Sequence, residues 1–299
     1  MNLRTKLEGV LLPIVTPFGD DASVDLAALS QNLSRWATTG ITGYVVLGST
    51  GERVHLNDRE YLDVIETARA AVSRDLAFIA GAGQHSTVGT INEVKGAAAA
   101  GAEAVLVITP HYYRAAMTQE TLVSYYTAVA DASPIPVLLY SMPALTGIKI
   151  EPETIARLSE HENIIGVKDS SNDVNGFAAT VKLCPPDFAV LTGNGTVFRD
   201  ALRAGATGAI LAVGCVVPEM CVEVLRAFKA GDDERASLLQ SKLTPLAAAV
   251  TTRFGIGGLK AALDLVGYRG GAVRAPLRAP DESARDEIAL LLKDALATS

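Results

Sequence analysis

The sequence predicts a (β/α)₈ TIM barrel of the α/β class with a C-terminal helical extension, and three observations support this fold class. Eight short apolar runs recur along the chain, each closing on polar or glycine residues. Segments of helical length and period separate these runs, at a repeat of roughly 30 residues that is typical of parallel strand–helix units. The length of 299 residues suits one barrel of about 250 residues with an appendage.

The eight runs have the composition of strands that are buried on both faces. Stretches such as AVLVITP and GAILAVG are continuously apolar and rich in β-branched residues. Closing eight parallel strands into a barrel leaves no sheet edge, whereas the alternative, an open doubly wound sheet, lacks its usual GxGxxG motif here. The predicted strands are Gly9–Pro17, Gly43–Ser49, Leu76–Gly83, Ala102–Pro110, Pro136–Pro143, Ile164–Ser171, Phe188–Asn194 and Gly208–Gly214.

Helical periodicity fills the segments between the strands and all of the chain after about Val217. Asp58–Ser73 places Tyr61, Leu62, Ile65 and Ala68 on one face, and Asn57 precedes it as a helix cap. We expect residues 1–225 to form the barrel and residues 226–299 to form a helical region that packs on it as one structural unit. The last four predicted helices are Glu219–Ala230, Asp232–Val250, Gly255–Val266 and Ser283–Ala297.

Composition excludes several classes of function. Lysine and arginine total 26 against 33 acidic residues, a net charge of −7, and basic runs are absent, which argues against nucleic acid or an anionic membrane as a partner. No apolar stretch reaches the ~18 residues that span a membrane, so we expect a cytoplasmic protein. Its three cysteines share no CxxC spacing and suit a reducing compartment. The four histidines are widely spaced, so we expect no metal.

Two side chains at predicted strand ends point to imine chemistry. Catalysis in such barrels takes place at the carboxyl ends of the strands. Lys168 ends the apolar run Ile164–Val167, where removal from water frees an amine to act as a nucleophile; a lysine that reaches solvent or pairs with Asp169 is the alternative. Tyr140 ends the preceding strand, where its hydroxyl requires a partner and suits either a proton shuttle or a structural hydrogen bond.

A glycine-flanked turn follows the second predicted strand. In Gly48-Ser49-Thr50-Gly51-Glu52 the glycines let the backbone approach a ligand, and the two hydroxyls add hydrogen-bond donors. Such a turn suits a carboxylate, although an ordinary turn before a helix has the same composition.

Taken together, the motifs resemble the dihydrodipicolinate synthase / N-acetylneuraminate lyase family of class I aldolases. GSTGE, TPHYY, LLYSMPALTG and GVKDSS occur in that family's order and spacing, and the similarity extends from about Gly9 to about Leu277. The resemblance implies a homotetramer, a dimer of dimers, that acts on a 2-keto acid such as pyruvate and uses no metal or other cofactor.

The resemblance also implies a role for each matching residue. Lys168 forms the imine with the substrate, Tyr140 relays protons, and Thr50 holds the pyruvoyl carboxylate. Ser49 links Tyr140 to a second tyrosine, which the family takes from a neighbouring subunit; Tyr112 is the best match for it and Tyr113 the reserve. Two further residues match positions that line the pocket, namely Gly193 and Ile210.

One departure from the family pattern concerns the substrate. Synthases usually carry an arginine five residues after the catalytic tyrosine, and Leu145 occupies that position here. Leucine cannot make the bidentate contacts of a guanidinium with a carboxylate. TPHYYRAAM and the tail AAVTTRFGIGGLK resemble the 4-hydroxy-2-oxoglutarate aldolases instead, and Ser170 is placed to bond a substrate hydroxyl. Thr50 departs from that branch, some of whose members have asparagine there.

The leading hypothesis is therefore a lysine-imine aldolase that cleaves 4-hydroxy-2-oxoglutarate to pyruvate and glyoxylate. The alternatives within the family are 4-hydroxy-tetrahydrodipicolinate synthase and another sugar-acid aldolase. A barrel that only senses a keto acid is the non-enzymatic alternative. The Lys168 and Tyr140 pair argues against a sensor, because binding alone needs no imine-forming lysine.

Overall fold

In the computed structural model, which describes residues 2–297, eight parallel strands close into a barrel in sequence order, as predicted. The barrel closes where β8 pairs with β1. Every strand lies inside its predicted run and ends before the last residue of that run. The strands are β1 Val10–Pro13, β2 Gly43–Val46, β3 Ala77–Ala82, β4 Ala104–Ile108, β5 Val137–Ser141, β6 Ile164–Asp169, β7 Ala189–Thr192 and β8 Gly208–Ile210.

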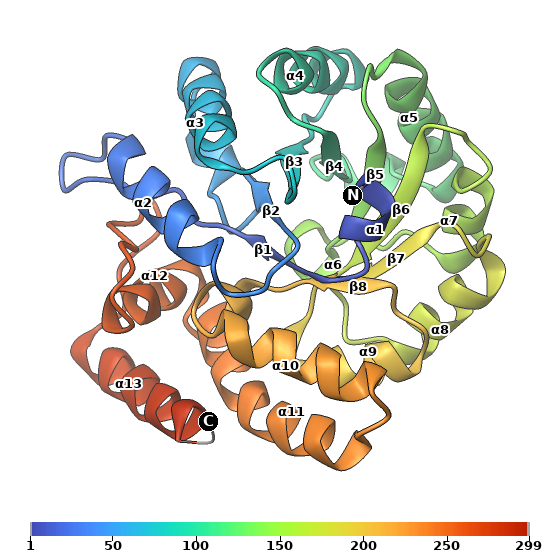
Figure 1. The fold of residues 1–299 in the computed structure, drawn as a ribbon. Helices are drawn as coiled ribbons and strands as arrows, with labels where there is room; N and C mark the ends of the chain where they lie inside the picture. Colours follow the sequence, from blue (N-terminus) through green and yellow to red (C-terminus); the bar gives the residue numbers. More distant parts are fainter. Residues whose placement is uncertain (1, 298–299) are drawn as a thin grey trace.

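Helices surround the strands (Figure 1). Those of the barrel are α2 Leu26–Trp36, α3 Asp58–Ala71, α4 Thr87–Ala99, α5 Gln119–Ala132, α6 Pro143–Thr146, α7 Pro152–Leu158, α8 Val174–Leu183, α9 Phe198–Arg203 and α10 Pro218–Lys229. A capping box at Asn57 begins α3, as the predicted cap required. That helix buries Val64, while Leu62, predicted on the buried face, is only half-buried.

The short helix α1, Leu3–Lys6, lies over the middle of the barrel in Figure 1. Leu7, which follows it, belongs to the cluster of buried apolar side chains inside the barrel, together with Tyr140 and Ile210. The chain enters the first strand directly from α1, so α1 covers the amino-terminal end of the strands. The carboxyl end remains available for a site.

The C-terminal helices are α11 Asp233–Ala248, α12 Gly255–Leu265 and α13 Glu282–Leu296. A π-helical turn, Ala249–Arg253, joins α11 to α12. Arg253 pairs with Glu287 on α13, which ties these helices together. α11 packs against both α10 and α13. No helix within residues 2–297 is long and apolar enough to cross a membrane.

Candidate active site

Lys168 and Tyr140 lie side by side at the carboxyl end of the barrel. The register pairs Tyr140 on β5 with Lys168 on β6, and the Lys168 Nζ atom is 4.4 Å from the centre of the Tyr140 ring. Both side chains are buried. Adjacent parallel strands bring residues at matching register positions together, so the two predicted residues meet as expected.

Lys168 differs from the other buried lysines. Lys6 forms an ion pair with Glu103, and Lys260 forms one with Glu52. Within residues 2–297, no carboxylate is close enough to form an ion pair with Lys168. The alternative pairing with Asp169 is therefore absent from the described structure. The amine of Lys168 instead faces an aromatic ring, which leaves it available for reaction.

Gly193 lies on the loop after β7, and because it has no side chain, Lys168 can lie against it. A Cβ atom at this position would lie 2.6 Å from Lys168 Cε and 2.0 Å from Ser170 Oγ. Both distances are shorter than non-bonded atoms tolerate, so only glycine fits without a shift. The Ser170 Oγ atom is buried with no hydrogen-bond partner within the described residues, and it therefore retains the capacity to bond a ligand. Ile210 is fully buried on β8.

The glycine-flanked turn after β2 places Ser49 beside Tyr140. The two hydroxyl oxygens are 3.5 Å apart, at the upper limit of a hydrogen bond. Leu47 and Glu52, which bracket this turn, both have left-handed backbones, with φ of 58° and 53°. Non-glycine residues seldom adopt this conformation, and such strain clusters at functional sites. Thr50 is almost fully buried inside the turn.

A cavity of about 610 Å³ opens from Tyr140 toward the loops after β2, β3 and β4. Ser49, Tyr140 and Leu145 line it, and so do His85 and His111, whose ring centres are 4.7 Å apart. Burial and the neighbouring His111 lower the pKa of His85, so its ring tends to be neutral. Among residues 2–297, no group of three or more histidine, cysteine, aspartate or glutamate side chains is arranged to hold a metal ion.

Tyr112 and Tyr113 lie outside this cavity, on the loop between β4 and α5. Their exposed fractions are 73% and 71%, and their rings contact each other edge to face. Tyr112 also contacts the ring of His85. Within one chain, neither tyrosine joins the Tyr140 and Ser49 pair through a hydrogen bond in the described structure.

Comparison with known proteins identifies the family. The model of the dihydrodipicolinate synthetase family matches residues 6–295, nearly the whole chain. The chain belongs to this family. It is accordingly a lyase of the aldolase type, and members of the family act through a Schiff base on a lysine.

Individual relatives in the family are similar over their full length. The 4-hydroxy-tetrahydrodipicolinate synthase of Syntrophus aciditrophicus is 35% identical over 96% of this chain and 98% of its own. That of Methanothrix thermoacetophila is 36% identical, covering 96% and 95% of the two chains. Both relatives are named for 4-hydroxy-tetrahydrodipicolinate synthase, the activity given above as an alternative to the leading hypothesis. The comparisons do not single out the hydroxyoxoglutarate branch.

Solved structures of the family superpose closely on this barrel. A dihydrodipicolinate synthase of Bacillus anthracis has a TM-score of 0.92 at 29% identity, covering 95% of this chain and 97% of that one. A prophage protein of E. coli K12, solved in complex with pyruvate, has a TM-score of 0.90 at 29% identity, covering 96% and 98%.

Sequence reasoning missed two residues next to the site. Glu52 was noted only as the end of the glycine-flanked turn, and Lys260 only as the last letter of the tail AAVTTRFGIGGLK, yet the two form a buried ion pair. A charged residue in an otherwise apolar helical face was the available signal for Lys260, since such residues are buried only when paired. Its partner, 208 positions earlier (260 − 52), had no local signal.

Proposed function

We propose that this chain is an aldolase that cleaves 4-hydroxy-2-oxoglutarate to pyruvate and glyoxylate through an imine on Lys168. The observation that carries the imine role is the buried Lys168 amine beside Tyr140, with no carboxylate partner in the described structure. A lysine removed from water without an ion pair is suited to attack a ketone.

The proposed steps use groups of this chain. The Lys168 amine attacks the C2 ketone, and loss of water from the carbinolamine leaves a protonated imine. Tyr140 accepts the proton of the C4 hydroxyl as the C3–C4 bond breaks, and the bonding electrons move to the imine nitrogen. Glyoxylate leaves, the resulting enamine takes a proton at C3, and water then releases pyruvate and restores the amine. Ser49, 3.5 Å from the Tyr140 hydroxyl, would pass the proton onward.

Two features, one in the cavity wall and one beside Lys168, favour a hydroxylated keto acid. Leu145 lines the wall with 58% of its surface exposed, so no charge occupies the position of the synthases' arginine. The unpartnered Ser170 Oγ atom lies close to Lys168 around Gly193, where a substrate hydroxyl would satisfy it. Thr50 and the turn around it would hold the carboxylate next to the ketone.

A candidate cation for the far carboxylate of this substrate is on the loop between β4 and α5, against the residue two positions after Leu145. The Arg114 guanidinium packs against Gly147, where a Cβ atom would lie 3.2 Å from Arg114 Nε. Arg114 is exposed and forms no ion pair with the rest of residues 2–297. We infer that Arg114 takes over the carboxylate contact that Leu145 cannot make, because a guanidinium matches a carboxylate in shape and charge.

We further propose that Tyr112 serves the site of a neighbouring subunit in a homotetramer, with Tyr113 in reserve. The adjacent exposed rings of Tyr112 and Tyr113 support this, because exposed tyrosines are enriched at protein interfaces. The pyruvate bound to the E. coli prophage protein supports pyruvate as the shared product.

The second candidate is 4-hydroxy-tetrahydrodipicolinate synthase, which the names of the relatives favour. The two are separated by assaying both reactions on one preparation as kcat/KM. We expect cleavage of 4-hydroxy-2-oxoglutarate to exceed condensation of pyruvate with aspartate semialdehyde. A preference for the semialdehyde would assign the chain to the synthases.

A further inference from the structure

Lys260, on α12, is a fully buried lysine far from Lys168 in the sequence but close to the β2 turn. Its Nζ atom lies 2.6 Å from Glu52 Oε1. It also donates hydrogen bonds to the backbone oxygens of Thr16, at 2.8 Å, and Ala272, at 2.6 Å. Lys260 thus has one ion pair and two backbone hydrogen bonds, and its ammonium faces the ring of Phe18 at 4.4 Å. These contacts come from separate segments of the chain and fix the position of Lys260.

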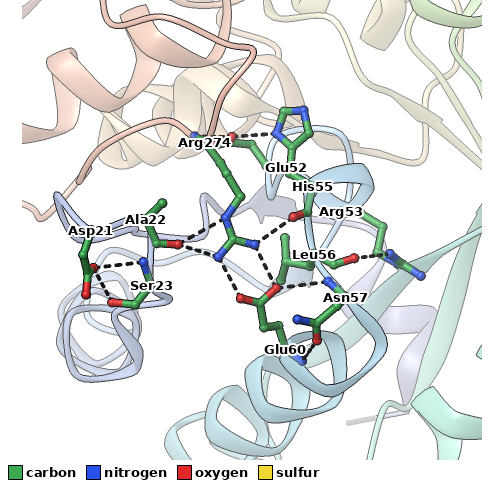
Figure 2. Close-up of polar contacts among 10 residues, drawn as sticks. All are labelled: Asp21, Ala22, Ser23, Glu52, Arg53, His55, Leu56, Asn57, Glu60 and Arg274. Atoms are coloured by element: carbon green, nitrogen blue, oxygen red, sulfur yellow. Dashed lines mark hydrogen bonds and ion pairs between the residues drawn. The ribbon is translucent and has the colours of Figure 1, made fainter.

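The other oxygen of Glu52 accepts hydrogen bonds, whereas Oε1 has only the ion pair with Lys260 within residues 2–297. Its Oε2 atom accepts hydrogen bonds from the backbone nitrogen of Arg274, at 3.1 Å, and from Nδ1 of His55, at 3.0 Å. The Arg274 side chain then binds both oxygens of Glu60 and the backbone oxygen of His55 (Figure 2). Lys260 and Arg274, both in the C-terminal region, therefore contact the segment that follows β2 at Glu52, His55 and Glu60.

These contacts include the glycine-flanked turn, residues 48–52, which carries Ser49 and is called the catalytic turn below. Glu52 is the left-handed residue that ends the turn, and its backbone nitrogen donates to the backbone oxygen of Ser49. The Thr16 hydroxyl donates to the backbone oxygen of Gly51 at 2.7 Å. Lys260 binds Glu52 and the backbone of Thr16 at once, so it spans the carboxyl ends of β1 and β2. The position of the Ser49 hydroxyl opposite Tyr140 is set by the backbone of this turn, which the contacts of Glu52 and Gly51 hold in place.

We propose that Lys260 is a positioning residue for the imine chemistry, acting through Glu52 to hold Ser49 against Tyr140. The C-terminal helices are then part of the catalytic unit. A strained turn needs surrounding contacts that hold it in place, and removing one member of a buried ion pair leaves an uncompensated charge. The inference rests on the proposed role of Ser49.

The chain offers a matched control at the opposite end of the barrel. Lys6 is also a buried lysine; it pairs with Glu103 at 3.2 Å and donates to the backbone oxygens of Arg74 and Leu76. Lys6→Met and Lys260→Met therefore remove similar interactions. Both variants are expected to unfold at lower temperature, but only one of the two pairs touches the catalytic turn.

The measurement is the exchange of pyruvate methyl protons for deuterium in D₂O, followed by NMR, which needs only the imine, the enamine and proton transfer. We expect Lys260→Met to slow the exchange about tenfold or more, the scale of small misplacements of catalytic groups. Lys6→Met is expected to stay within about twofold of the unmodified chain. If Lys260→Met does not fold, Glu52→Gln is compared with Glu103→Gln in the same way.

A double-mutant cycle then separates positioning from general destabilisation. In a Ser49→Ala background the effect of Lys260→Met on exchange should largely disappear, because residues acting as a unit are not additive. An undiminished effect in that background, or an equal loss with Lys6→Met, would overturn the role of Lys260. If Ser49→Ala alone leaves exchange unchanged, the proposed role of Ser49 fails, and the inference about Lys260 fails with it.

Discussion

The Lys168 Nζ atom lies 4.4 Å from the centre of the Tyr140 ring, and the two residues occupy matching positions on neighbouring strands. This places an amine and a phenol on the same small region of the barrel mouth. The hydroxyl of Tyr140 lies 3.5 Å from that of Ser49, so the Tyr140 side chain contacts both the Lys168 amine and the Ser49 hydroxyl that we propose as the next proton carrier.

The first prediction concerns which lysine forms the imine. Borohydride with pyruvate should add the mass of a reduced pyruvate imine to Lys168, because Lys6 and Lys260 are held in ion pairs and Lys168 has none within residues 2–297. Peptide mass spectrometry locates the adduct. Lys168→Met should abolish both the adduct and turnover. An adduct on a different lysine in the unmodified chain would contradict the mechanism.

Tyr140→Phe should lower turnover by about 100-fold or more, the usual scale for a positioned proton-transfer group, while part of the imine formation is retained. The reason is that the ring contact with Lys168 survives and only the hydroxyl is lost. Steady-state kinetics and borohydride trapping measure the two effects.

The matched control is Tyr44→Phe, which removes a buried hydroxyl that donates to the backbone oxygen of Leu33 at 2.9 Å, away from Tyr140. That change should cost on the order of 1 kcal/mol of stability and leave turnover nearly intact. Equal turnover in Tyr140→Phe and the unmodified chain would make Tyr140 a structural residue.

Gly193→Ala should reduce imine trapping by about 100-fold, because its methyl group would displace Lys168 and Ser170, and a misplacement of about 1 Å has that scale of effect. The overpacking should also cost roughly 1–3 kcal/mol of stability. Gly96→Ala is the control: its added methyl meets nothing closer than 3.6 Å on α4. Trapping that is equal in both variants would show that the space beside Lys168 is not needed.

Leu145→Arg should raise synthase activity relative to cleavage of 4-hydroxy-2-oxoglutarate. A bidentate charge pair with a substrate carboxylate is worth roughly 2–5 kcal/mol, on the order of 30- to several-thousand-fold in specificity. The ratio of kcat/KM for the two reactions on the same preparation tests this. The gain should be incomplete, because the His111–Met117 loop also shapes the site.

Arg114→Gln provides the counterpart of that experiment. It should raise KM for 4-hydroxy-2-oxoglutarate by about tenfold or more, since a charge-assisted contact contributes about 1.5–3 kcal/mol. Trapping with pyruvate should not change, because pyruvate has no far carboxylate. A KM unaffected by the change would leave the far carboxylate without its proposed partner.

The amino-acid sequence alone determined the barrel and the main pair of site residues. Eight apolar runs predicted the strands because strands buried on both faces must be apolar throughout. The runs extend past the strand ends because buried apolar residues such as Ile14 and Leu211 follow the strands. Lys168 and Tyr140 were predictable because parallel strands bring their carboxyl ends to one face of a barrel.

Only the tertiary structure decided what supports that pair. Glu52 meets Lys260, Glu60 meets Arg274, and Arg114 packs on Gly147. Ion pairs and packing contacts depend on distance in space, and no periodicity or local motif records which partner a charge will meet after the chain has folded. In the sequence, Gly193 has the composition of a turn residue. In the folded barrel, its lack of a side chain leaves the room that the Lys168 side chain needs.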